Sequence, residues 1–176
     1  MDEMLLRIFQ TEVERQARFG LVAAADLKKA ITSGDKDRIW YSIQSLLIAV
    51  GNVSKLFWPS RPEMLKRGGD LRTCLGVPDL SPLNPRTLRN HFEHFDERLE
   101  QWATSSHRKN FVDSNVGPTG MISGLDPGDH LRNFDTTKWA VTFAGDECSL
   151  KPVVDELRKV AENARRALAP SRNHSR

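Results

Sequence analysis

Cysteine is scarce in this chain, and its scarcity argues against two kinds of protein. Only Cys74 and Cys148 occur among 176 residues, and they are far apart in the sequence. Zinc sites and disulfide-rich secreted domains need closely spaced or numerous cysteines. We therefore expect no cysteine-based metal site and a reduced, cytoplasmic setting.

Long hydrophobic runs and targeting signals are also missing. No apolar run approaches the ~20 residues that cross a bilayer, and the opening Met-Asp-Glu-Met-Leu-Leu lacks the basic start of a signal peptide. The pair Gly68-Gly69 does not have the spacing of a phosphate-binding glycine loop. The sequence thus predicts a soluble, cytoplasmic protein with no membrane partner and no cofactor.

The composition is that of one globular domain. Hydrophobic residues make up 39% of the chain and charged residues 28%, which is ordinary for a folded protein. A length of 176 residues is enough for one well-buried core, and we expect a single domain over 1–168. The formal net charge of +3 permits contact with nucleic acid without arguing for it.

Four segments have the apolar periodicity of amphipathic helices. The first runs over about 2–32 and is interrupted by Gly20. The second follows the turn and cap signal at 33–35 and should end at Trp58, because a proline disfavours helical geometry in the residue before it. Its apolar positions alternate at spacings of four and three: Ile39, Ile43, Leu46, Val50, Val53 and Phe57.

The third and fourth helices follow Asn84-Pro85 and Lys151-Pro152. Each amphipathic helix must bury one face, so four of them favour an all-α, up-down four-helix bundle. The long connection over 106–149 is an excursion from this bundle, and its alternation predicts a small β-hairpin of 131–134 with 137–143. The polar end of the chain, 169–176, is expected to be a flexible tail.

The third helix also carries polar residues that folding alone does not require. At ~100° per residue, Arg89, Asn90 and His94 lie off the apolar side, and Asn90 and His94 are neighbours one turn apart. His91 lies only ~60° from the apolar side and is expected to face the core in part. Arginine binds phosphate and histidine transfers protons near neutral pH. Together they can bind and cleave a phosphodiester without a metal.

The pattern Arg89-Asn90-x-x-x-His94 resembles the Arg-polar-x-x-x-His motif of the HEPN superfamily, the higher eukaryotes and prokaryotes nucleotide-binding domains. Members of this family are helical bundles, and many are metal-independent ribonucleases. The resemblance covers the four-helix organisation, and its specific part is six residues long. It implies that His94 transfers a proton at the RNA 2′-hydroxyl or the leaving oxygen. Arg89 would hold the scissile phosphate, and Asn90 would orient His94 or donate to the phosphate.

The resemblance also implies partners and a product. The expected assembly is a homodimer with two copies of the motif in one cleft, acting on RNA to leave a 2′,3′-cyclic phosphate. The implied biological role is that of a toxin or phage-defence component, with an antitoxin protein as a further partner. Arg86 is an auxiliary phosphate contact in this interpretation, and the basic residues Lys66 and Arg67 are further candidates for binding RNA.

Three other interpretations remain open at this point. Ordinary i,i+3 and i,i+4 ion pairs on a solvated helix face explain the charges around the motif, although not its histidines. A catalytically inactive helical RNA- or protein-binding or dimerisation module would keep the fold and lose the activity. A metal-binding bundle would use His91 and His94, but the other predicted helices offer no histidine.

Overall fold

The computed structural model describes residues 2–84, 87–105 and 109–169, without the side chains of 87–89, 119 and 127. The helices are α1 (Glu3–Ser33), α2 (Lys36–Phe57), α3 (Leu65–Leu75), α4 (Thr87–Glu93), α5 (Phe95–Ser105) and α6 (Leu150–Leu168). The strands are β1 (Asn115–Val116), β2 (Arg132–Asp135), β3 (Ala140–Phe143) and β4 (Asp146–Ser149). Short 3-10 helices lie at Pro62–Met64, Thr119–Met121 and Pro127–Asp129.

Helices α1, α2 and α6 form the helical layer, with α2 and α6 both packed on α1. The predicted apolar positions of α2 are all buried, which confirms that helix and its face. Its start is also as predicted: Gly34 adopts a left-handed φ of 70°, and the Asp35 carboxylate accepts a hydrogen bond from the Arg38 amide at 3.0 Å. Gly20 does not interrupt α1. A Cβ there would lie 2.7 Å from Leu157 Cδ1, so the glycine allows α6 to approach α1 closely.

The all-α four-helix bundle is wrong, because the predicted 106–149 excursion contains, within residues 115–149, a four-stranded mixed sheet in the order β1-β2-β3-β4. β2 and β3 pair antiparallel, as do β3 and β4, while β1 pairs with β2 in parallel. The predicted hairpin is therefore only the middle of a larger sheet, and 136–139 form its turn rather than strand. Apolar residues of β2 and β3 belong to the same hydrophobic cluster as the helices: Phe134, Val141 and Phe143.

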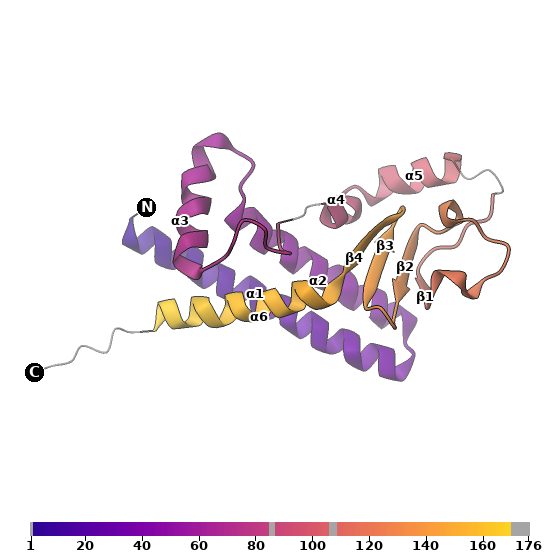
Figure 1. Ribbon diagram of the computed structural model, residues 1–176, viewed down its shortest axis with the longest axis horizontal. Helices are drawn as coiled ribbons and strands as arrows, with labels where there is room; N and C mark the ends of the chain where they lie inside the picture. Colours follow the sequence, from indigo (N-terminus) through magenta and orange to yellow (C-terminus); the bar gives the residue numbers. More distant parts are fainter. Residues whose placement is uncertain (1, 85–86, 106–108, 170–176) are drawn as a thin grey trace, which may run out of the picture.

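The predicted third helix is two helices, α4 and α5, that meet at His94. None of the α5 residues is buried, so its apolar side does not enter the helical core. The bundle interpretation expected the third helix to complete the core with its apolar side. In the structure the sheet packs there instead. Figure 1 shows α5 running beside the sheet, at the opposite end of the molecule from α3. Of the predicted flexible tail, only Ala169 is among the described residues.

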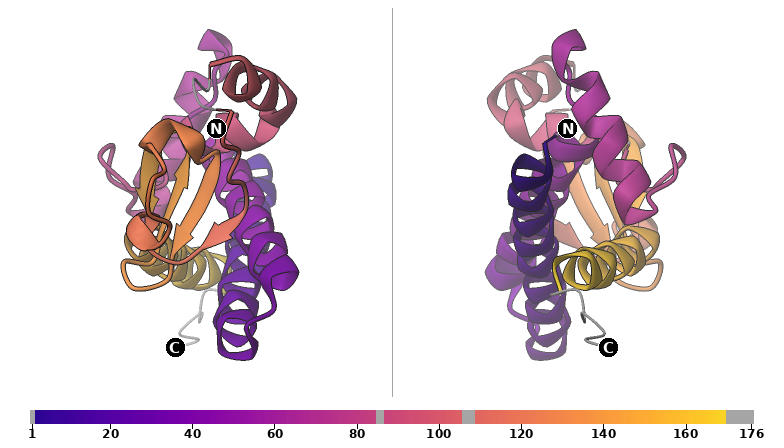
Figure 2. Two further views of the ribbon diagram at one scale, coloured as in Figure 1. Left: turned by 90° about the vertical axis from the view of Figure 1, so that its right-hand side faces the viewer. Right: turned by 90° about the vertical axis from the view of Figure 1, so that its left-hand side faces the viewer.

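Polar contacts hold the start of the sheet in place, one of them to α2 and one within the sheet region. The indole nitrogen of Trp40, in α2, donates to the Ser114 carbonyl at 2.8 Å. The guanidinium of Arg132, at the start of β2, binds both carboxylate oxygens of Asp113. The two views in Figure 2 show the resulting arrangement, with the sheet beside the long α1 and α2 helices. Within the described part of the chain, no helix is long and apolar enough to cross a membrane.

Candidate functional site

The motif residues lie at the junction of α4 and α5, where helical hydrogen bonding continues across the break. The His94 amide donates to the Asn90 carbonyl at 3.0 Å, and the Arg98 amide donates to the His94 carbonyl at 3.2 Å. Residues four apart on a helix lie on the same side, one turn after another. Asn90, His94 and Arg98 therefore form one polar row along α4 and α5.

His94 is accessible to a ligand from solvent. Its side chain is 55% exposed, and its Nδ1 lies 3.6 Å from Oε1 of Glu97, a carboxylate that is itself 67% exposed. Exposed pairs of this kind hold a side chain only weakly. Asn90, one turn earlier, is half-buried. The side chain of Arg89 and the whole of Arg86 lie outside the described residues.

His91 has a different environment, although it is only three residues from His94. It is buried, and its ring stacks on Phe143 with the centroids 5.1 Å apart and the planes 5° from parallel. Its Nε2 lies 2.6 Å from Oδ2 of Asp146, at the start of β4. The prediction that His91 faces the core is confirmed, and this histidine connects α4 to the sheet.

Lys66 and Arg67 are not brought to the motif. Both are in α3, which packs on α1, α2 and α6. The Lys66 ammonium pairs with Asp70 at 3.0 Å, and the Arg67 guanidinium lies 4.4 Å from the ring centroid of Phe9. Figure 1 shows the separation of α3 from α4 and α5. Any ligand contact at these two residues would therefore be separate from one at His94.

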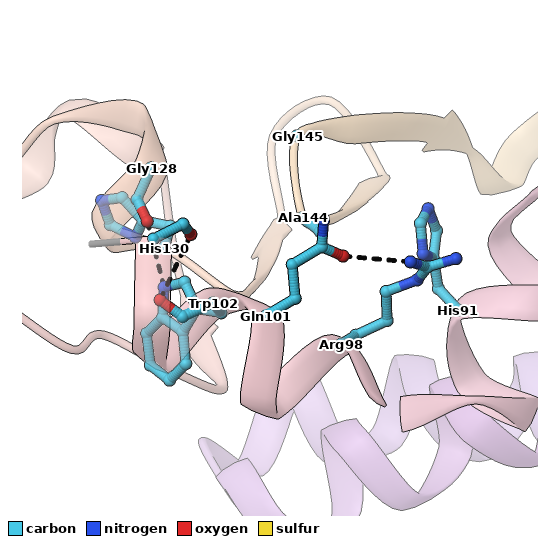
Figure 3. A pocket seen from close by; sticks show the side chains of 9 residues that line it. His91, Arg98, Gln101, Trp102, Gly128, His130, Ala144 and Gly145 are labelled. Carbon is cyan, nitrogen blue, oxygen red and sulfur yellow. Dashed lines mark hydrogen bonds between the residues drawn. The ribbon is translucent and has the colours of Figure 1, made fainter. Parts of the chain in front are cut away.

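A pocket of about 450 Å³ lies beside the polar row, between α4 and α5 on one side and the loops around β2, β3 and β4 on the other. Figure 3 shows Arg98 and Gln101 of α5 near the turn between β3 and β4, and His130 on the far side beside Trp102. The pocket is lined by His91, Arg98, Gln101, Trp102, Ser105, Gly128, His130, Ala144 and Gly145.

The sequence contained a weak signal for this pocket. Arg98 is four residues after His94, so the helix places it in the same row, but its charge fitted a solvated helix face equally well. His130 lies in a loop, and nothing in the local sequence relates it to α5. Only the pairing of the strands brings it opposite Trp102.

Cys148 lacks the environment of a reactive nucleophile. Both thiols are free, and burial raises the pKa of the Cys148 thiol, whereas a reactive cysteine needs a lowered one. Among the described side chains, no three His, Cys, Asp or Glu residues come together as a metal site. The metal-binding interpretation of His91 and His94 therefore gains no support, since the two side chains lie in different environments.

Comparison of the chain with family models, with curated proteins and with solved structures finds no match.

Proposed function

We propose that this chain is a metal-independent endoribonuclease whose chemistry is that of the HEPN motif. In this proposal His94 transfers protons, Asn90 orients His94 and Arg89 holds the phosphate. The observation that carries the proposal is the contrast between two histidines. His91 is occupied by the core and by Asp146, whereas His94 is exposed on the same helix side as Asn90. Folding accounts for His91 and leaves His94 available for chemistry.

The proposed reaction is an internal transfer at phosphorus. The RNA 2′-hydroxyl loses its proton and attacks the adjacent phosphorus, and the bond to the 5′-oxygen of the next nucleotide breaks as that oxygen gains a proton. The products are a 2′,3′-cyclic phosphate and a 5′-hydroxyl. Histidine can serve at both proton transfers, because its pKa lies near neutrality. The motif assigns Asn90, one turn before His94, to orient that histidine, and it alone assigns the Arg89 side chain to the phosphate.

One protomer offers a single exposed histidine in this row, although the reaction has two proton transfers. A second copy of the chain, related by a two-fold axis, would bring its own His94 and complete the pair. Phe95 and Leu99, which follow His94 in α5, are 50% and 42% exposed. Exposed apolar side chains beside a site are typical of a surface that a partner covers. We assign that surface to the second protomer.

The test is RNA cleavage in the presence of EDTA, with identification of the product ends. His94→Gln should lower the rate by at least about 100-fold, which is the lower range of general acid–base catalysis, and the wild-type product should carry a cyclic phosphate. Glu162→Gln, at an exposed position of α6, is the matched control and should cleave like the wild type. Cleavage by His94→Gln at the wild-type rate would refute the proposal, as would a product without the cyclic phosphate.

A second function is favoured by the same apolar surface of α5. Exposed Phe95 and Leu99 would serve a catalytically inactive binding or dimerisation module equally well. This alternative expects dimers without cleavage by any variant. The EDTA experiment therefore decides between the two functions when the oligomeric state is measured on the same samples.

A further inference from the structure

Three residues that line the pocket between α5 and the sheet each have a buried polar atom that the protein itself does not satisfy. Nε of Arg98, Nδ1 of His91 and Nδ1 of His130 are buried and have no hydrogen-bond partner within the described part of the chain. His130 as a whole is only 7% exposed. An unsatisfied buried polar atom is unfavourable and calls for an explanation. Three of them belong to residues that line a single pocket.

The residues that line the pocket favour an anionic ligand. Its lining residues include one arginine and two histidines, and no aspartate or glutamate. Four carboxylates are adjacent in sequence to lining residues. Asp146 contacts His91 Nε2 at 2.6 Å, Asp129 accepts from the Asp126 amide at 2.9 Å, and Glu97 and Glu100 are exposed. Arg98 uses Nη1 to bind Gln101 Oε1 at 3.1 Å. Its other N–H groups form a planar fork that suits phosphate oxygens.

An aromatic surface adjoins the pocket. The Trp102 indole lines it and is held by a hydrogen bond from Nε1 to the Gly128 carbonyl, at 3.0 Å. Phe111 meets Trp102 edge to face, with ring centroids 4.9 Å apart, and is 48% exposed. Single-stranded nucleic acids bind where a cationic groove for the backbone lies next to aromatic rings for the bases. The hydrogen bond holds the Trp102 ring in place, and the exposed ring of Phe111 beside it is the one on which a base can stack.

We propose that this pocket is a phosphate subsite for single-stranded RNA, with Arg98 binding a backbone phosphate and Phe111 stacking on a base. The inference rests on the proposed ribonuclease function for the path of the strand. Arg98 is one helical turn, ~5–6 Å along the axis, from His94, so one strand can lie in the pocket while its neighbouring phosphodiester lies at His94. Arg98 and Phe111 are binding residues in this arrangement, and His94 remains the reacting one.

The test measures binding apart from cleavage. The probe is a fluorescein-labelled single-stranded RNA with 2′-O-methyl groups throughout, which cannot form the cyclic product, and the readout is fluorescence anisotropy. Arg98→Gln should weaken binding at least tenfold. Arg165→Gln, which removes the same charge from an exposed position of α6, should weaken it less than twofold. Phe111→Ser should weaken it about fivefold or more, as expected for loss of one stacked base.

Measuring RNA binding and RNA cleavage on the same variants distinguishes failure of the subsite from failure of the proposed function. His94→Gln should weaken binding of the uncleavable RNA less than Arg98→Gln does, since it leaves the pocket intact. If Arg98→Gln and Arg165→Gln weaken binding equally, or if the wild type does not bind the RNA, the subsite is refuted whatever the cleavage assay shows. If binding depends on Arg98 and Phe111 but cleavage does not depend on His94, the subsite stands and the ribonuclease proposal fails. Thermal melts of Phe111→Ser and Arg98→Gln verify that both variants are folded.

Discussion

The ring of His91 lies parallel to the ring of Phe143, 5.1 Å away, and thereby joins α4 to β3. The same histidine contacts Asp146 through Nε2, so a single side chain bridges two strands and a helix. His94, one turn further along, makes only an exposed contact with Glu97. Two histidines of one short segment therefore have separable roles, one in folding and one at the surface.

This difference predicts that the same substitution changes the free energy of unfolding strongly at His91 and hardly at all at His94. His91→Ala removes a buried ring, its stacking on Phe143 and its hydrogen bond, and should lower the free energy of unfolding by about 2–4 kcal/mol. His94→Ala should change it by less than about 0.5 kcal/mol, as is usual at the surface. Urea unfolding of the two variants measures both values. Similar losses for the two would contradict the assignment of His91 to the core.

Removing apolar side chains from α5 should dissociate the proposed dimer. Phe95→Ser and Leu99→Ser, alone or together, should shift the protein towards monomer, measured by light scattering after size-exclusion chromatography. Leu80→Ser is the matched control, because Leu80 is 98% exposed in the loop before α4. If the control dissociates the protein as strongly as the α5 variants do, the interface lies elsewhere. RNA cleavage should fall in parallel with the dimer, since each site needs two histidines.

Two adjacent glycines of α3 should respond in opposite directions to alanine. A Cβ at Gly68 would lie 2.5 Å from the Phe57 carbonyl oxygen and 2.6 Å from Pro59 Cδ, so α3 would have to move away from the end of α2. We expect Gly68→Ala to destabilise by about 1–3 kcal/mol, as overpacking does. Gly69 has open space around it, and Gly69→Ala should stabilise by about 0.5–1 kcal/mol through helix propensity. Chemical denaturation of the pair tests both signs at once.

The ion pair of Asp113 with Arg132 should make stability depend on acid pH. Burial acts to raise the pKa of Asp113, but the hydrogen bonds and charge of Arg132, with hydrogen bonds from Ser114, outweigh it and leave that pKa below its usual value. The stabilisation is therefore complete above the unfolded-state pKa of about 4 and is lost as the pH falls through the lower, folded-state value. Asp113→Asn should be less stable than the wild type by about 1–3 kcal/mol at pH 7, and the gap should narrow in acid.

The control for that prediction is Asp26→Asn in α1, where the carboxylate pairs with Lys29 at an exposed position. Exposed pairs contribute little, so this variant should follow the wild-type stability curve from pH 7 down to about pH 3. A constant gap between wild type and Asp113→Asn over the same range would show that the ion pair is not the source of the acid dependence.

The long helices could be predicted from the sequence, but the elements that pack against them could not. The spacing of Ile39, Ile43 and their successors predicts both the existence of α2 and its buried face, because many residues agree on one period. The apolar side of the 88–102 segment also requires a partner, but periodicity does not say which. The sheet contributes Phe134, Val141 and Phe143 to the core, and α5 is left at the surface.

The missed strands and the missed pocket have related causes. β1 has two residues, and β4 reads Asp-Glu-Cys-Ser, a sequence without strand propensity that pairs because β3 offers it an edge. His130 comes to the pocket only through that pairing. By contrast, the placement of Asn90 and His94 on one side of a helix needed local geometry alone, and the structure agrees with it. The chemical role of these residues stays a prediction.

The passage from β4 to α6 has no connecting loop: Ser149 ends the strand and Leu150 begins the helix, with the Leu150 amide bonded to the Trp139 carbonyl at 2.8 Å. Asp146, which holds His91, is thus four residues from a helix whose other end packs on α1 and α3. The β4 side of the pocket is therefore joined directly to α6. We therefore expect the amide protons of β3 and β4 to exchange with solvent together with those of α6, as one cooperative unit, while α5 exchanges earlier and independently.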